Sequence, residues 1–180
     1  MLQKPRLDSQ IVAEFLQFCF ERHDTFCNQK YDSRLPYSMH LRYVLAQHSR
    51  FKHLLSSDYE VALTKVGCAG HDLIEDARMT FNDIVTEVGV EAAEIIFACT
   101  ETRGHDRPER HSKEYYDYLA KNDLAVFVKL CDILANVKYG LLTNSSMFKK
   151  HKAEFVDTVG YLHREKYAPM FKELAKIFEL

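Results

Sequence analysis

Charged carboxylates inside apolar, helix-compatible stretches constrain this chain more than any other feature of its sequence. Asp132 lies within VFVKLCDILANV, and the adjacent His71 and Asp72 lie within GCAGHDLIEDA. An unpaired carboxylate buried in such a stretch is strongly destabilising, so each one needs a partner or a metal ion. His40 supplies a second imidazole upstream. Two imidazoles and two carboxylates suit a divalent cation of intermediate hardness and leave open positions for water and a phosphate oxygen, which predicts a metallohydrolase.

Length, charge and cysteine usage narrow the class of protein. A chain of 180 residues is most simply one domain, with a motif core at about 29–140 and C-terminal helices at about 147–178. A net charge of -2 argues against broad electrostatic attachment to polymeric nucleic acid or to an anionic membrane. The cysteines have no CxxC spacing, and no apolar signal segment or spanning helix is present, so we expect a soluble, reduced, cytoplasmic protein. The sequence leaves homo-oligomer formation open.

Helical periodicity dominates the chain and predicts an all-α, single-domain helical bundle over residues 1–180. Thr80 and Asp83 have the spacing of a capping box. No alternating pattern predicts a strand. The expected helices run over about 9–22, from His40 to Gln47, and over about 59–77, 80–88, 90–100, 108–121, 124–142, 147–162 and 165–178.

Two glycines lie inside the helix expected over 59–77. Gly67 and Gly70 each cost about 1 kcal/mol relative to alanine at such positions. Either another helix or a substrate comes close to the bare backbone, or the glycines mark a kink or a tight packing contact. The sequence does not decide between these explanations.

The HDxxED motif adds two carboxylates next to the expected metal ligands. Consecutive helical residues point about 100° apart, so His71 and Asp72 can share an ion only if it lies over the edge between them. Glu75 and Asp76 lie one turn further on, where they would orient or deprotonate the attacking water. The residues between the two pairs are the apolar Leu73 and Ile74 rather than lysine or arginine. This favours a metal site over a structural polar network.

The remaining histidines have polar or charged neighbours, which predicts surface positions. We expect this of five of them and also favour exposure of the two in or beside the polar loop at 101–110, where they could otherwise touch a ligand. The five are His23, His48, His53, His151 and His163, and the two near the loop are His105 and His111.

Several residues are candidates for contacts with a phosphorylated substrate. Asn136 lies one turn after Asp132 and would bond a substrate hydroxyl or a base edge, or else a neighbouring helix. Lys129 would place an ammonium near a phosphate or only offset the local acidic charge. The bases of the polar loop are phosphate candidates too, although most of them are expected to be merely solvated: Arg103, Arg107 and Arg110, with Lys113 just beyond.

With these motifs in view, the chain resembles the HD-domain metal-dependent phosphohydrolases. More narrowly, it resembles the alarmone hydrolase domain of RelA/SpoT homologues, including the small stand-alone hydrolases. LPYSMH is similar to that family's PYxxH, GHDLIEDARMT to its HDxxEDTxxT, and KLCDILANV to its KLADRLxN. The resemblance covers about Gln29 to Gly140.

The resemblance implies an all-helical domain that binds one manganese ion and hydrolyses the 3'-pyrophosphate of ppGpp-like nucleotides, releasing pyrophosphate. By the same resemblance, Glu75 and Asp76 would surround the nucleophilic water and Asn136 would contact the substrate. The implied metal ligands are His40, His71, Asp72 and Asp132.

The chain departs from this pattern where the family holds its nucleotide. The family's basic pair falls on Tyr31 and Asp32 in this chain, and Lys30 is one step away. The threonine that the family has three residues after its asparagine falls on Tyr139. The threonine of HDxxEDT is Ala77. We retain Lys30 and Tyr31 as substrate-binding candidates, and a tyrosine there could stack on a base. Metal binding and phosphoester or phosphoanhydride hydrolysis therefore carry over better than the identity of the nucleotide.

Two other functions compete with the alarmone hydrolase. One is an HD phosphatase that acts on another nucleotide or phosphorylated metabolite. The other is a non-catalytic module that binds metal and nucleotide as a sensor or scaffold. The presence of both Glu75 and Asp76 argues against the non-catalytic alternative.

Overall fold

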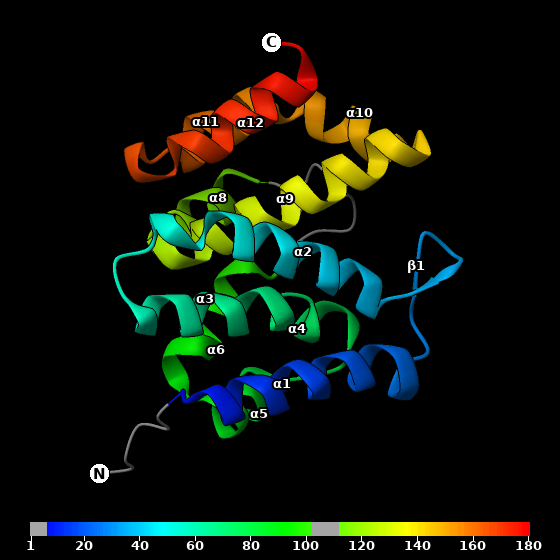
Figure 1. The fold of residues 1–180 in the computed structure, drawn as a ribbon, viewed down its shortest axis with the longest axis vertical. Helices are drawn as coiled ribbons and strands as arrows, with labels where there is room; N and C mark the ends of the chain where they lie inside the picture. The colour runs from blue at the N-terminus through cyan, green and yellow to red at the C-terminus, as the bar shows by residue number, and fades with distance from the viewer. Residues whose placement is uncertain (1–6, 102–111) are drawn as a thin grey trace.

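The computed structural model describes residues 7–101 and 112–180, and nearly all of its regular elements are helices (Figure 1). The prediction of an all-α fold is confirmed. The elements are α1 (Ser9–Glu21), the π-helix η1 (Arg22–Phe26), β1 (Lys30–Tyr31), β2 (Leu35–Pro36), α2 (Ser38–Phe51), η2 (Lys52–Leu54), α3 (Asp58–Gly70), α4 (Leu73–Asp76), α5 (Phe81–Val88), α6 (Val90–Cys99), α8 (Lys113–Leu119), α9 (Asp123–Thr143), α10 (Ser146–Ala153), α11 (Phe155–Leu162), η3 (Glu165–Tyr167) and α12 (Ala168–Phe178).

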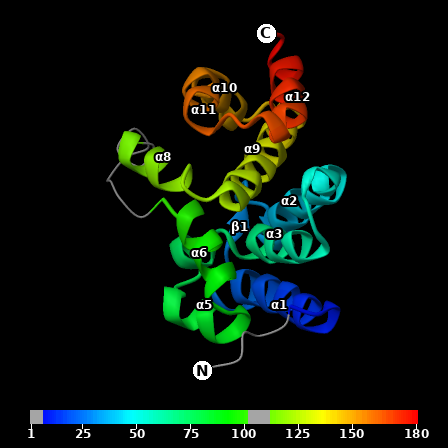
Figure 2. The same cartoon turned by 90° about the vertical axis from the view of Figure 1, so that its left-hand side faces the viewer.

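The helices stack in layers, from α1 and α5 near the N-terminus to α10, α11 and α12 near the C-terminus (Figure 1). Helix α9 lies between these ends and contacts α2, α3, α6, α10 and α12. Turning the molecule shows α8 to one side, next to α6 and α11 (Figure 2). Because α9 is buried around most of its circumference over 125–135, any polar side chain there must find its partners inside the protein.

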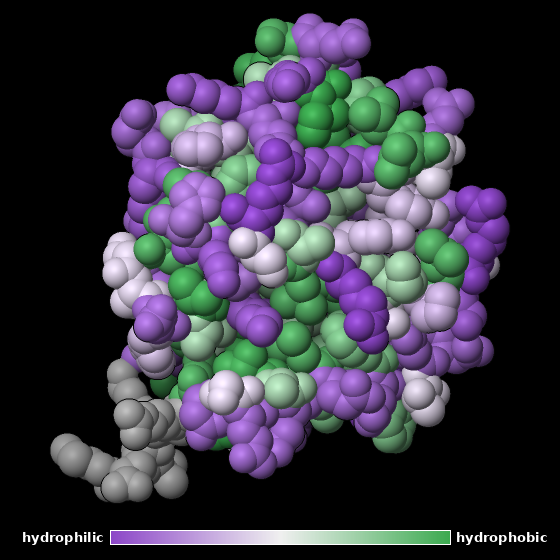
Figure 3. Space-filling model, viewed as in Figure 1, coloured by the Kyte–Doolittle hydropathy of each residue, from purple (hydrophilic) through white to green (hydrophobic). Residues whose placement is uncertain are grey.

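The surface in Figure 3 is mixed in character, and the apolar stretches of the described helices are limited in length. Hydrophilic side chains cover much of the face in Figure 3, with hydrophobic ones between them. Within 7–101 and 112–180, no helix combines the length and the apolar character needed to cross a membrane. Even the longest of these helices, α9, carries Lys129 and Asp132 near its middle.

The helix expected over 59–77 is wrong as a single element, because it breaks at the histidine–aspartate pair. Helix α3 ends at Gly70, Asp72 has φ -101° and ψ 2°, and α4 starts at Leu73. Since the backbone turns here, His71 and Asp72 are not fixed at helical spacing and can point toward one centre. The helix expected over 147–162 also divides, into α10 and α11 on either side of Glu154.

The glycines of α3 are explained by tight helix packing. A Cβ on Gly67 would lie 2.8 Å from Ile95 Cγ2, and one on Gly70 would lie 2.6 Å from Ile96 Cδ1. Both contacts are with α6, so the bare backbone lets α6 approach α3 closely. This settles the choice left open by the sequence in favour of a neighbouring helix rather than a substrate.

A short hairpin joins η1 to α2 and was not expected from the sequence. Strands β1 and β2 are antiparallel, with Tyr31 opposite Leu35. Asp32 and Ser33 at the turn have φ of 51° and 60°, in the left-handed region that aspartate tolerates better than most residues. Two-residue strands are too short to show alternation, which is why the pattern did not reveal them.

Three of the histidines expected at the surface are buried instead: His23, His48 and His151. His23 Nδ1 lies 2.6 Å from Gln29 Oε1, and His48 Nε2 lies 3.0 Å from Thr64 Oγ1. An imidazole with such a partner can be buried in neutral form, and partners distant in sequence are not visible in local composition. His53 and His163 are exposed as expected, while His105 and His111 lie outside the described residues.

Gly140 provides a test of the packing between α9 and α10. A Cβ at Gly140 would lie 2.9 Å from the backbone nitrogen of Phe148, which cannot move as a side chain can. We expect Gly140→Ala to lower the free energy of unfolding by about 1 to 3 kcal/mol, measured by urea titration. Gly160→Ala is the matched control: it meets nothing within 4 Å and should be neutral or stabilising, by up to about 1 kcal/mol. Equal effects of the two substitutions would contradict this packing.

Candidate metal centre

Three segments far apart in the sequence bring the four predicted metal ligands together. His40 lies in the first turn of α2, His71 and Asp72 form the junction of α3 and α4, and Asp132 lies in the middle of α9. His40 and His71 are each 2% exposed and Asp132 is 6% exposed, so these side chains are withdrawn from water.

The donor atoms of the four residues have the spacing of a coordination shell. His40 Nε2 lies 3.2 Å from His71 Nε2, 3.5 Å from Asp72 Oδ2 and 3.3 Å from Asp132 Oδ1. His71 Nε2 lies 3.0 Å from Asp72 Oδ2 and 3.5 Å from Asp132 Oδ1. Ligands held at 2.0–2.2 Å around a tetrahedral or octahedral ion are separated by about 3.0 to 3.5 Å. His40, His71 and Asp72 therefore form a group that could hold a divalent cation, with one donor atom from each within 4.8 Å of the others. Asp132 Oδ1 adds a carboxylate oxygen close to both imidazoles.

Hydrogen bonding on the far side of His71 directs its lone pair inward. His71 Nδ1 lies 3.1 Å from the carbonyl oxygen of Cys68, which can only accept, so the hydrogen is assigned to Nδ1. In the neutral imidazole, His71 Nε2 then presents a lone pair to the other three predicted ligands. A ligating histidine typically has this arrangement, with its second nitrogen bonded to a carbonyl or a carboxylate.

Without a cation, the cluster is held by opposite charges. Burial disfavours the charged carboxylates, but for Asp132 the Lys129 ammonium and hydrogen bonds from His40 and His71 hold the pKa well below its usual range. Burial likewise disfavours the charged form of His71, yet Asp72 and Asp132 raise its pKa well above the usual value. Because a metal needs neutral imidazoles, we expect its binding to release protons.

Both carboxylate ligands are oriented by donors that are not ligands themselves. The Tyr37 hydroxyl donates to Asp72 Oδ2 at 2.5 Å. Asn136 Nδ2 donates to Asp132 Oδ1 at 2.7 Å, and Lys129 Nζ lies 3.3 Å from Asp132 Oδ2. Sequence reasoning missed Tyr37, although it lies within LPYSMH, three residues before a ligand, at the spacing that puts two side chains on one helix face.

Helix α4 places the predicted catalytic pair next to the ligands. Asp76 Oδ2 lies 3.3 Å from the Tyr37 hydroxyl oxygen, and Glu75 accepts a hydrogen bond from the backbone N–H of Glu101. Burial and then the charge of Asp72 raise the pKa of Glu75 to about 7. A carboxylate with such a pKa is able to accept a proton near neutral pH, and a cation bound nearby would lower that pKa.

The predicted substrate-binding residues differ in their surroundings: some are paired inside the protein, one is exposed, and others lie outside the described residues. Lys129 is buried and pairs with Glu101 at 2.8 Å, so its charge is offset locally, which was one of the two roles considered for it. The Tyr31 hydroxyl donates to Asn136 Oδ1 at 3.1 Å, which joins these two candidates to each other. Lys30 is exposed on β1. Arg103 and Arg110, with Arg107, lie outside the described residues, and Lys113 pairs with Asp117 at 2.5 Å.

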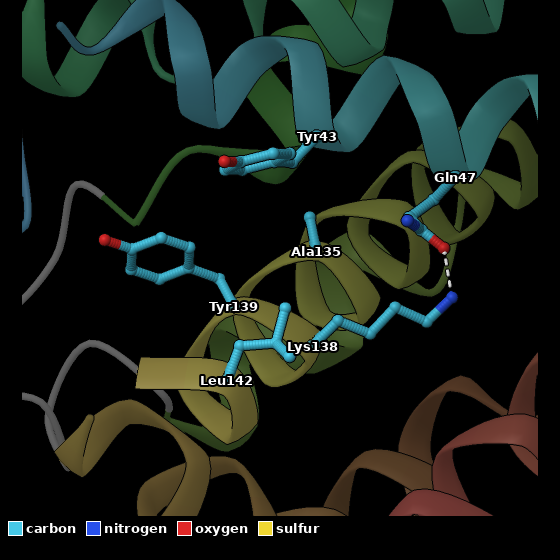
Figure 4. Close-up of a pocket in the computed structure, with 6 residues that line it drawn as sticks. All are labelled: Tyr43, Gln47, Ala135, Lys138, Tyr139 and Leu142. Carbon is cyan, nitrogen blue, oxygen red and sulfur yellow. Dashed lines mark hydrogen bonds between the residues drawn. The ribbon is translucent and has the colours of Figure 1, made fainter. Parts of the chain in front are cut away.

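A pocket of about 110 Å³ opens between α2 and α9, and none of the four predicted metal ligands lines it (Figure 4). Tyr43 and Tyr139 lie on opposite sides of it, 5.8 Å apart between ring centres. Lys138 Nζ donates to Gln47 Oε1 at 2.7 Å. The Tyr139 ring also contacts the Tyr31 ring at 4.6 Å, so Tyr31 lies between the pocket and the metal centre. The lining residues are Tyr43, Gln47, Ala135, Lys138, Tyr139 and Leu142.

One of three comparisons with known proteins finds a similar fold. No model of a protein family matches the chain, and no curated protein matches it by sequence. A solved structure from work on a metazoan ortholog of SpoT that hydrolyzes ppGpp and plays a role in starvation responses is similar, with a TM-score of 0.76. The match covers 96% of this chain and 96% of that chain at 21% identity. The chain therefore shares the all-α fold of that structure over nearly its whole length.

Removing either carboxylate ligand should abolish metal binding. We expect Asp72→Ala and Asp132→Ala each to lose bound metal, measured as metal per chain after loading with manganese and desalting, because each substitution opens the shell on a different side. Asp117→Ala, on the exposed face of α8, is the matched control and should keep the metal content of the unmodified chain. Native metal content in either ligand variant would show that the ligand set is wrong.

Proposed function

We propose that this chain is a metal-dependent phosphohydrolase that removes the 3'-pyrophosphate from ppGpp-like nucleotides and releases pyrophosphate. The observation that carries the proposal is the shell of four donor atoms beside a carboxylate pair, 3.0 to 3.5 Å apart along the five measured edges. A protein of the same fold over 96% of the chain comes from work in which it hydrolyzes ppGpp, which supports the choice of substrate.

The metal we propose is manganese, held by His40, His71, Asp72 and Asp132. A mixed nitrogen and oxygen donor set suits a cation of intermediate hardness, and thiolates, which would favour softer metals, are absent from this set. When bound, the cation would polarise a phosphoryl oxygen and lower the pKa of a water molecule.

Glu75 and Asp76 would act on the attacking water. We assign Glu75 as the proton acceptor, because its pKa is raised toward neutrality and its position is held by the Glu101 backbone. We assign Asp76 to orienting the same water, since the Tyr37 hydroxyl lies between Asp76 and the ligand Asp72. The general base must be ionised, so activity should fall as the pH drops through the pKa of Glu75.

The substrate would approach the centre from the side of the hairpin, where Lys30 is exposed. Developing negative charge would be offset by basic side chains, and the candidates remain Lys30, Lys129, Arg103 and Arg110. Asn136 is the candidate for the nucleoside. We further propose that residues 1–180 form one domain of a cytoplasmic protein, whose substrate is a small nucleotide rather than a polymeric nucleic acid or a membrane.

The alternative is an HD phosphatase that acts on another nucleotide or phosphorylated metabolite. It is favoured by one specific observation: the family's basic pair and threonine are replaced by Tyr31, Asp32 and Tyr139, and these three form their own contacts. The Tyr139 hydroxyl donates to Asp32 Oδ2 at 3.0 Å, which leaves an aromatic and acidic wall where the family has basic groups.

A nucleotide panel separates the two functions. Manganese-loaded protein is incubated with ppGpp, other guanine and adenine nucleotides and sugar phosphates, and pyrophosphate and inorganic phosphate are measured separately. We expect pyrophosphate from ppGpp, with a nucleoside 5'-diphosphate remaining. Inorganic phosphate from other compounds, with ppGpp untouched, would favour the alternative. The absence of any product would contradict both.

Glu75→Gln should separate catalysis from metal binding. The amide keeps the size of the side chain but cannot accept the proton, so we expect kcat to fall about 10²- to 10⁴-fold with the metal content unchanged. Glu14→Gln, on the exposed face of α1, is the matched control and should leave both quantities as they are. Unchanged turnover in Glu75→Gln would remove Glu75 from the mechanism.

A further inference from the structure

We propose that Tyr31 is a positioning residue of the metal centre, whose ring holds His40 and whose hydroxyl holds Asn136 against Asp132. The inference rests on the metal centre of the proposed function and assigns this tyrosine a task on the protein's own ligands. It does not depend on which phosphorylated compound is the substrate.

His40 is the ligand that lacks hydrogen-bonded support. The other three each have it: the Cys68 carbonyl for His71, Tyr37 for Asp72 and Asn136 for Asp132. His40 Nδ1 is buried and has no hydrogen-bond partner among the residues that the structure describes. A ligating histidine normally donates from its second nitrogen, which fixes the angle of the ring. The His40 ring must therefore be fixed in another way.

The ring of Tyr31 is stacked against His40. Their ring centres lie 5.0 Å apart with 29° between the planes, an offset-stacked arrangement. Pairing of Tyr31 with Leu35 in the hairpin fixes the backbone that carries the ring. An aromatic contact of this kind changes an equilibrium constant by roughly 2- to 10-fold beyond the burial of its area.

The hydroxyl of Tyr31 reaches the other side of the centre. It donates to Asn136 Oδ1 at 3.1 Å, and this bond orients the amide so that Nδ2 faces Asp132 Oδ1 at 2.7 Å. Asp132 Oδ1 is the ligand atom 3.3 Å from His40 Nε2. Tyr31 thus contacts one imidazole ligand directly and one carboxylate ligand through an amide.

The hairpin is itself attached to α9, which keeps Tyr31 in place. Asp32, next in sequence, accepts from the Tyr139 hydroxyl at 3.0 Å, and the Tyr139 ring lies 4.6 Å from the Tyr31 ring. These contacts turn Tyr31 toward the ligands and fill the space on its outer side. At this position the hydrolases that the chain resembles carry a basic residue of the nucleotide clamp. This chain instead has Tyr31 in contact with His40 and Asn136, an arrangement we call the aromatic brace.

The test measures manganese affinity in the absence of any nucleotide, by isothermal titration calorimetry. Tyr31→Phe keeps the ring and loses the hydroxyl, and we expect the Kd to rise about 2- to 10-fold, the value of one hydrogen bond. Tyr31→Leu loses both contacts, and we expect a rise of about 10- to 100-fold. Tyr118→Phe and Tyr118→Leu are matched controls, because Tyr118 lies on α8, where its ring contacts Phe97; they should stay within about 2-fold.

Kinetics then separate positioning from substrate contact. A positioning role predicts that saturating manganese restores the KM of Tyr31→Phe to that of the unmodified chain, with any remaining loss in kcat. A raised KM at saturating manganese, with an unchanged manganese Kd, would overturn the inference and assign Tyr31 to the substrate. Circular dichroism confirms that each variant is folded, and if Tyr31→Leu does not fold, an unchanged Kd in Tyr31→Phe still overturns the inference.

Failure of the proposed function is distinguishable from failure of this inference. If the chain binds manganese but cleaves no ppGpp, the substrate is wrong, and the ranking of the Tyr31 variants by Kd still supports the brace. If the unmodified chain binds no manganese, the metal centre and the brace are both overturned.

Discussion

A carboxylate is buried in the middle of the central helix, and the need to balance its charge constrains how the neighbouring helices pack. Asp132 lies on α9, where nearly every neighbouring side chain is buried. Its charge is balanced by Lys129, by a hydrogen bond from Asn136 and by two imidazoles. The two imidazoles come from α2 and from the end of α3, so their meeting with Asp132 requires that α2, α3 and α9 pack together in one way. A buried charge thereby specifies the arrangement as well as the chemistry.

Much of this could be predicted from the sequence, because its causes are local. The apolar run of α9 and the capping box from Thr80 to Asp83 are both present in the structure, and Gly89 ends α5 with a φ of 86°. The four predicted metal ligands could be proposed from the sequence because charged groups in apolar helices are costly without partners, a rule that needs no knowledge of the fold.

The remaining features depend on contacts between residues far apart in the chain. The break between α3 and α4, the burial of His23 and the hydrogen bond from Tyr37 to Asp72 all arise from segments that meet only after folding. Local pattern predicts a helix through the histidine–aspartate pair, whereas the structure turns there and points both side chains inward. The hairpin carrying Tyr31 was missed for another reason: its two-residue strands are too short to show alternation.

The ligands come from three segments that the unfolded chain holds far apart, with His40 and Asp132 at the two extremes. A cation bound by all of them would act as a removable cross-link, comparable in effect to a disulfide that closes a long loop. Since the unfolded chain cannot assemble this shell, the folded state would gain stability in proportion to the logarithm of free metal concentration. The supply of metal in the cell would then govern how long the protein persists as well as how fast it works.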